Sequence, residues 1–169
     1  MSDTRPQQTD MSPAEIADRV WELIDRIGFC MFVTWDGTQI ASRPLSSRVA
    51  RDAHAIHFLV SAGSSRSWHI DTQPRVNLAY ADTGAMKFVS LSGTAALDND
   101  RAKIAELWSA FDKAWWDDAD DPDIRLLTVT PESAELWDSP NKAVAFAAML
   151  GAAVTGGKPK LGDNATTQL

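Results

Sequence analysis

The 169-residue chain has one cysteine, no excess of basic residues and no long apolar run, and each absence excludes a class of protein. Cys30 has no partner for an internal disulfide, and a zinc site built on thiolates would lack ligands. The formal net charge of −7 repels nucleic-acid phosphates, and no basic patch offsets it. No apolar stretch reaches the roughly 18 residues that a membrane helix needs, and the polar residues 1–10 lack the core of a signal peptide. The sequence therefore predicts a cytoplasmic protein that binds neither nucleic acid nor membrane.

The composition is that of an ordinary globular domain, with a hydrophobic fraction of 44% and a charged fraction of 23%. We expect a disordered N-terminal arm over residues 1–11, one folded domain over 12–155 and a flexible C-terminal tail over 156–169. No internal repeat divides the domain.

Helix signals open the domain. Ser12, Pro13 and Glu15 have the spacing of a capping box with proline at the first helical position, and Gly28 is suited to end the helix that begins there. Further helices are expected over residues 64–73, after a cap at Asp98 or Asn99, and over 143–154.

Between these helices, apolar residues alternate with polar ones or form short β-favouring runs. Asp36-Gly37 is a strong signal for a hairpin turn, and Pro131 is expected to separate the last two strands. The strands are predicted over residues 29–35, 39–46, 57–60, 76–81, 87–95, 124–130 and 134–137. Because alternating strand and helix units are missing, the pattern predicts an α+β, mainly β fold with an antiparallel sheet that can close as a barrel.

Two groups of residues that could bind metal are incomplete. His54, His57 and His69 do not have the spacing of a metal site, so we interpret them as surface or turn residues and expect no metal. The acidic residues 117–123 lack the glycine and the terminal glutamate of an EF-hand, and they are expected to form a solvated loop.

Small polar and cationic residues at strand ends form the remaining candidate site. Pro44 lacks a backbone N–H, so the strand that carries Arg43 must lie at an edge or a bulge, where free backbone groups can pair with a planar heterocycle. Residues 61–66 bring hydroxyls, a glycine and a guanidinium together before a predicted helix, and such donors suit a phosphate. A solvated arginine and a simple helix cap explain the same residues.

Three blocks of residues occur in a recognisable order. They are Arg43-Pro44-Leu45, residues 64–82 with the motif Asn77-x-Ala79-Tyr80-Ala81-Asp82, and Phe88-Val89-Ser90-Leu91-Ser92-Gly93. Together they resemble the pyridoxamine 5′-phosphate oxidase-like family of FMN-binding split barrels. The later stretch, which ends in Leu136-Trp137-Asp138, is similar to the bacterial general stress protein branch, and the likeness covers about residues 14 to 155.

The resemblance implies a six-stranded antiparallel split β-barrel with flanking helices. It implies a homodimer with FMN, or alternatively FAD, in clefts at the subunit interface. The residues that would contact the cofactor are Arg43, Pro44, Leu45, Ser46, Val60, Ser61, Ser65, Arg66, Phe88 and Trp137. Ser65 and Arg66 would hold the phosphate, and Trp137 would come from the partner subunit, with core packing as the alternative for Phe88 and Trp137. Arg48 stands where the oxidases carry a cation for the substrate phosphate.

The sequence also departs from the true oxidases. After Asp138 it lacks their arginine-bearing C-terminal motif, and Val60 replaces a common hydroxyl residue, so oxidation of pyridoxamine phosphate is not expected.

The resemblance then implies an FMN-dependent oxidoreductase with a stress-related role. It would transfer hydride or electrons through flavin N5, with NAD(P)H or a small electrophile as partner, and its catalytic residues are unassigned. One alternative is a stress protein that sequesters flavin without turnover. The other is a barrel that has exchanged flavin for deazaflavin or for haem, with His57 or His69 as the axial ligand.

Overall fold

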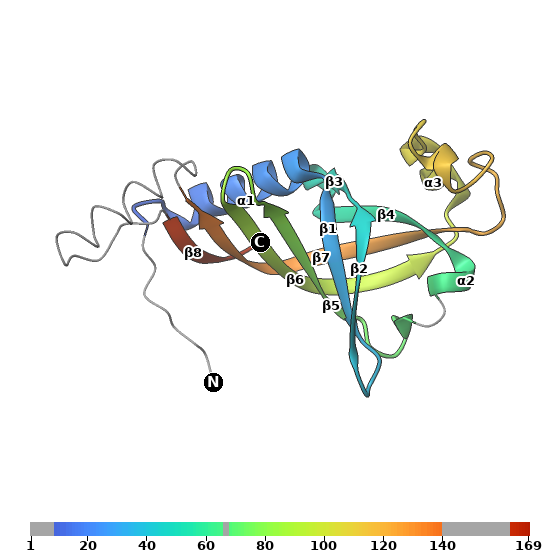
Figure 1. The fold of residues 1–169 in the computed structure, drawn as a ribbon, viewed down its shortest axis with the longest axis horizontal. Coiled ribbons are helices and arrows are strands. Elements are labelled where there is room, and N and C mark those ends of the chain that lie inside the picture. Colours follow the sequence, from blue (N-terminus) through green and yellow to red (C-terminus); the bar gives the residue numbers. More distant parts are fainter. Residues whose placement is uncertain (1–8, 66–67, 140–162) are drawn as a thin grey trace.

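The computed structural model describes residues 9–65, 68–139 and 163–169 (Figure 1). In chain order the elements are α1 (Pro13–Ile27), β1 (Phe29–Trp35), β2 (Ile40–Ser46), β3 (Arg48–Ala50), the 3-10 turn η1 (Arg51–Ala53), β4 (Ala55–Ser61), α2 (Ala62–Ser65), β5 (Arg75–Asp82), β6 (Lys87–Asp98), α3 (Arg101–Leu107), the 3-10 turn η3 (Asp112–Ala114), β7 (Ile124–Asp138) and β8 (Asp163–Gln168).

Helix α1 forms where the capping signals predict it. The Ser12 hydroxyl accepts a hydrogen bond from the Glu15 N–H, and the Glu15 carboxylate accepts one from the Ser12 N–H. Gly28 ends the helix in the left-handed conformation with φ 69°, which glycine adopts without strain. The buried face of α1 packs on the sheet and contributes Ile16, Val20, Trp21, Leu23 and Ile24 to the core.

The strands of the described residues belong to one antiparallel sheet of eight, in the order β2-β1-β5-β6-β7-β4-β3, with β8 on β7. The edge strands β2 and β3 are separated in the chain by Ser47 alone. The sheet must therefore curl until its two edges meet, which gives a split barrel around a core that includes Phe32, Phe58 and Leu78. The antiparallel, mainly β fold is confirmed, and the short strands β3 and β8 extend the six strands β1, β2, β4, β5, β6 and β7.

Strand β7 is continuous, although Pro131 was expected to divide it. The pairing of β6 with β7 shifts register between Ser92 and Gly93, and Pro131 lies opposite Gly93 at that shift. A β-bulge tolerates a residue without an N–H, so the strand passes through the proline. The two backbones are so close there that a Cβ on Gly93 would lie 2.3 Å from the carbonyl oxygen of Thr130.

Residues 163–168 form strand β8, although the sequence predicted a loose tail from Gly156. The strand pairs with the second half of β7, and the Thr167 hydroxyl donates a hydrogen bond to the Pro13 carbonyl of α1. Its buried residues are Ala165, which is small, and Thr167, which is polar, so they produce no hydrophobic alternation in the sequence. The helix expected over 143–154 lies outside the described residues.

Two helices differ from expectation in their bounds. The helix predicted over residues 64–73 is the short α2, which ends at Ser65. Helix α3 is capped by Asp100, whose carboxylate accepts the Lys103 N–H, and not by either of the two preceding residues. None of the helices in the described part of the chain has the length and apolar character that crossing a bilayer requires.

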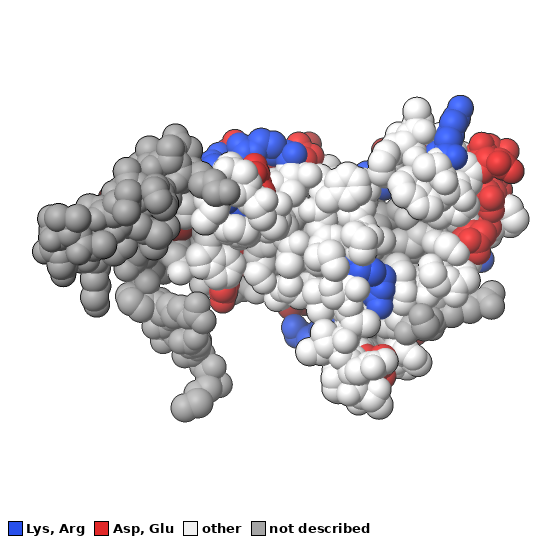
Figure 2. Space-filling model, in the orientation of Figure 1, with Lys and Arg blue, Asp and Glu red and all other residues white. Residues whose placement is uncertain are grey.

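Acidic side chains gather at the end of the molecule formed by α3 and the loop that follows it (Figure 2). This loop contains residues 117–123, and most of their side chains are exposed, as the sequence predicts for a solvated segment.

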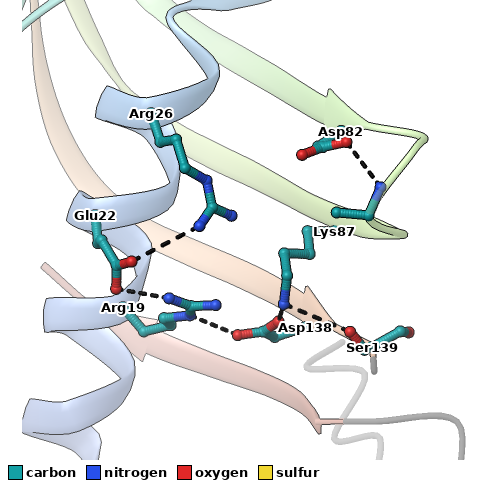
Figure 3. Close-up of polar contacts among 8 residues, drawn as sticks. Arg19, Glu22, Arg26, Asp82, Lys87, Asp138 and Ser139 are labelled. Carbon is teal, nitrogen blue, oxygen red and sulfur yellow. Dashed lines mark hydrogen bonds and ion pairs between the residues drawn. The ribbon is translucent and has the colours of Figure 1, made fainter. Parts of the chain in front are cut away.

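A network of ion pairs ties α1 to the start of β6 and the end of β7 (Figure 3). The Asp138 carboxylate accepts hydrogen bonds from Arg19 and Lys87, and Arg19 also pairs with Glu22. Burial opposes ionisation of Asp138, but the hydrogen bonds from the two cations outweigh it and hold the pKa of this carboxyl below its usual range.

Asp138→Asn is expected to lower the free energy of unfolding at pH 7 by about 2 kcal/mol, because it removes a charge that two hydrogen-bonded cations neutralise. Since the folded pKa lies below the unfolded value of about 3.9, the contribution of Asp138 is complete above that pH and is lost as the pH falls through the folded pKa. Urea titrations at several pH values should therefore show that the free energies of unfolding of the wild type and of Asp138→Asn converge below about pH 4. Glu22→Gln, at an exposed pair of the same network, should change little. A difference that stays constant down to pH 2 would contradict this account.

Candidate functional site

A cavity of about 230 Å³ lies between the end of β2, β3, the end of β4 and the segment that follows α3. Six residues that the sequence singled out line it together: Pro44, Leu45, Ser46, Arg48, Val60 and Ser61. The first four are almost consecutive across the junction of β2 and β3, so the cavity lies where the two edges of the curled sheet meet.

Aromatic rings form most of the remaining wall, and the sequence did not place them at the site. They are Phe29, Trp68, Phe111, Trp115 and Trp116. Phe111 contacts Phe29 edge-on, with ring centroids 5.8 Å apart, and lies 4.8 Å from Trp115. Phe29 and Trp115 nevertheless remain 52% and 60% exposed. Large exposed rings beside a cavity are typical of a surface that receives a ligand or a partner.

Arg48 anchors this aromatic wall. Its Nε donates to the carbonyl of Leu107 at 3.1 Å, and one terminal nitrogen donates to the carboxylate of Asp112. The other oxygen of Asp112 accepts the N–H and the hydroxyl of Ser109. Burial opposes ionisation of Asp112, but the hydrogen bonds from Arg48 and Ser109 outweigh it and keep the pKa below its usual value.

Asp123 accepts hydrogen bonds from the donors at the end of β4. Its carboxylate accepts the hydroxyl of Ser61 and the N–H of Gly63, and the Asp123 carbonyl accepts the N–H of Ala62. The hydrogen bond from Ser61 is the main reason why the pKa of Asp123 is lowered. Two of the donors that the sequence offered to a phosphate are therefore already paired with a carboxylate.

Arg43 does not line the cavity itself but contacts Trp68, a residue of its wall. Its guanidinium lies over the ring of Trp68, 4.5 Å from the centroid, and donates to the Thr34 hydroxyl at 3.1 Å. This cation–π contact and hydrogen bond hold the Trp68 ring against the site.

Ser65 lies away from this cavity. Its side chain is buried, and with His69 and Arg125 it lines a neighbouring, more polar cavity of about 360 Å³. Successive side chains of a helix turn by about 100°, so Ser64 faces the first cavity while Ser65 faces the second. Arg66, the predicted phosphate ligand, lies outside the described residues.

Phe88 and Trp137 face each other as cross-strand neighbours on β6 and β7. Neither lines the cavity beside β2 within one chain. The assignment of Trp137 to the flavin rests on a second subunit, and the assignments of both residues stay predictions.

The histidines do not form a site. His57 is buried in β4, contrary to the expectation of a surface or turn residue, and its Nδ1 is hydrogen bonded to the Thr128 hydroxyl. Burial lowers the pKa of His57. His54 lies in the turn after η1, and its Nε2 contacts the carbonyl of Pro131. Within residues 9–65, 68–139 and 163–169, no three His, Cys, Asp or Glu side chains lie close enough to hold a metal ion.

Comparison with known proteins gives one family. The family model described as pyridoxamine 5′-phosphate oxidase like matches residues 15–160. No curated protein matches the sequence.

Solved structures resemble the chain over most of its length. A protein assigned as general stress protein 26 from Jannaschia sp. CCS1 is 26% identical with a TM-score of 0.74, over 94% of this chain and 100% of that one. The general stress FMN/FAD binding protein from Xanthomonas citri is 24% identical with a TM-score of 0.65, over 76% and 91%. A protein related to general stress protein 26 from Clostridium acetobutylicum is 15% identical with a TM-score of 0.68, over 94% and 97%. The two structures below 25% identity support the fold alone.

Proposed function

The chain belongs to the pyridoxamine 5′-phosphate oxidase-like family, and on that premise we propose that it binds FMN beside β2 and β4 and acts as an oxidoreductase. One observation carries the proposal. Six of the positions that the family resemblance assigns to the cofactor or substrate come together around one cavity with aromatic walls.

The residues at this cavity fit a flavin ring. The aromatic side chains offer flat apolar surfaces, and edge strand β2 leaves backbone N–H and C=O groups without a strand partner on one side. The phosphate end is more restricted, because Asp123 already accepts the hydroxyl of Ser61 and the N–H of Gly63. A phosphate would therefore lie toward the neighbouring cavity, which Ser65 and Arg125 line together, with Arg66 as the phosphate ligand that the family resemblance implies.

When bound, FMN supplies hydride and electron transfer at its N5 atom. The protein's residues bind and orient the ring. Arg48 and Asp112 fix the segment that carries Phe111 and Trp115, and these rings form one side of the cavity. Arg43 fixes the Trp68 ring.

A homodimer would complete this site. Along β1 the side chains of Phe29, Met31 and Trp35 point away from the barrel core and are exposed, and Ile40, opposite Trp35 on β2, is 72% exposed. Contiguous exposed apolar side chains on a sheet mark an association surface. Phe29 belongs both to this outer face and to the cavity wall, so a partner seated on the face would also reach the cavity.

A flavin-sequestering protein without turnover is the second candidate, and the cavity lining favours it. Among the described lining residues, Arg48 and Asp112 are the ionisable ones, and they are paired with each other. Neither is then available as a general acid or base.

The first experiment is an absorbance spectrum of the purified protein after loading with excess FMN and desalting. We expect flavin bands at close to one FMN per chain, and NAD(P)H under anaerobic conditions should bleach them if the protein is an oxidoreductase. Retained flavin that NAD(P)H leaves oxidised supports the sequestering protein.

Ser46→Trp, which fills the cavity, should lower FMN affinity at least tenfold, whereas Ala102→Trp, at an exposed position of α3, should not. A protein that never retains flavin would overturn both candidates.

A further inference from the structure

Residues 108–116, between α3 and the acidic loop, carry much of the aromatic wall of the cavity and belong to no strand; we call them the wall segment. Both ends of the wall segment are anchored by apolar contacts, because Trp108 and Trp116 pack on the small core cluster that includes Leu59 and Ile104. What holds the middle of the segment against the barrel is a different kind of contact.

The middle of the wall segment buries a charge and exposes its rings. Phe111 and Trp115 are 47% and 60% exposed, whereas Asp112, which lies between them in the chain, is 3% exposed. In a segment held by apolar packing, the rings would be buried and the carboxylate would face water. The hold on the middle of the segment therefore depends on Asp112 more than on its rings.

The Asp112 carboxylate is bonded through both of its oxygens. One accepts a hydrogen bond from Arg48 on β3, and the other accepts the N–H and the hydroxyl of Ser109. Arg48 also donates to the carbonyl of Leu107, where α3 ends, so one guanidinium holds two points of this region against the junction of β2 and β3. The Arg48 and Asp112 side chains are 17% and 4% exposed. Removing one partner of such a shielded pair is costly, because the other charge stays buried without compensation.

We propose that the wall segment is a gate over the FMN site, and that the ion pair of Arg48 with Asp112 keeps it closed and so sets how fast the cofactor enters and leaves. The identity of the ligand rests on the proposed function, whereas the closing contact rests on this chain's own residues. Because the rings of Phe111 and Trp115 are already about half exposed, opening gives up little apolar burial and is opposed mainly by the ion pair. Asp112 is a positioning residue in this proposal, and it acts through Arg48.

Amide hydrogen exchange tests the closing contact without any flavin. Within the wall segment the N–H groups of Trp115 and Trp116 donate to the Asp112 carbonyl, so their exchange reports local opening. In the full chain without FMN, Asp112→Asn should speed exchange in peptides from residues 108–116 by about tenfold or more. Rates are compared as protection relative to the unfolded chain, which corrects for the changed side chain.

Stopped-flow mixing with FMN distinguishes a gate from a simple wall contact. A gate limits entry and exit alike, so Asp112→Asn should speed FMN association and dissociation by about tenfold or more each. The Kd for FMN should then change by less than about threefold. Faster dissociation with an unchanged association rate would mean that the pair only supports a contact with the bound ring, and it would overturn the gate.

Asp138→Asn is the matched control, because it removes a carboxylate of similar burial that is bonded to Arg19 and Lys87, away from the cavity. It should leave exchange in residues 108–116 and both FMN rates unchanged. Equal acceleration in the two variants would show that a general loss of stability is responsible and would overturn the proposal, as would wild-type rates in Asp112→Asn. A wild-type protein that binds no FMN would remove the proposed function, while hydrogen exchange would still decide whether Asp112 holds the wall segment closed.

Discussion

Gly93→Ala is expected to lower the free energy of unfolding by about 3 kcal/mol, because the new methyl group would overlap the backbone of the neighbouring strand. A Cβ at this position lies 2.3 Å from the Thr130 carbonyl oxygen and 3.0 Å from the Cα of Pro131. Both atoms belong to the backbone of β7, so they cannot rotate away as the end of a flexible side chain would. Urea titration followed by circular dichroism measures the loss.

Gly84→Ala is the matched control for this substitution. The Cβ at Gly84 would lie 3.4 Å from a carboxylate oxygen of Asp82, which is close to ordinary contact. Its effect should stay below about 1 kcal/mol. If the two variants lose the same stability, the close approach of β6 and β7 at the bulge is not what makes glycine necessary at position 93.

Met31→Asp is expected to weaken self-association on the order of a hundredfold, since it places a charge in the centre of the apolar outer face of β1. In a symmetric dimer each copy would bring its own aspartate into the same interface, so the two charges also repel each other. Sedimentation velocity over a range of concentrations measures the change, and FMN retention should fall with it if the partner completes the cavity.

Ala102→Asp serves as the control, because it adds the same charge at an exposed position of α3, away from this face. It should leave association and flavin retention unchanged. A wild-type protein that is monomeric at micromolar concentration would contradict the proposed dimer. A Met31→Asp monomer that retains FMN as well as the wild type would show that one chain forms the complete site.

The local parts of the fold could be predicted from the sequence because their signals lie within a few residues of one another. The capping box at Ser12 and the Asp36-Gly37 turn are of this kind, and both occur where the sequence predicts them. Strand β7 was not predicted as one strand, because what carries it through Pro131 is the bulge opposite Gly93 on another strand.

The site could be predicted as a set of residues but not as a set of contacts. The edge position of β2 follows from Pro44, and it brings Pro44 and Ser46 to the cavity. The partners of Arg48 and Ser61 could not be predicted, because Asp112 and Asp123 are more than 60 residues away in the chain and approach only when the barrel closes. The aromatic residues that precede the acidic loop, Phe111, Trp115 and Trp116, are the signal in the sequence that could have indicated this wall.

Three of the seven tryptophans, Trp68, Trp115 and Trp116, line the cavity, and the single tyrosine is buried in the core. The ultraviolet emission of this protein therefore comes mainly from indole rings, and nearly half of these rings stand at the cavity wall. A compound that enters the cavity alters the surroundings of all three at once, and a coloured compound also accepts their excitation by energy transfer. The wall that shapes the cavity thus makes the protein an optical sensor of its own occupancy, with no attached dye.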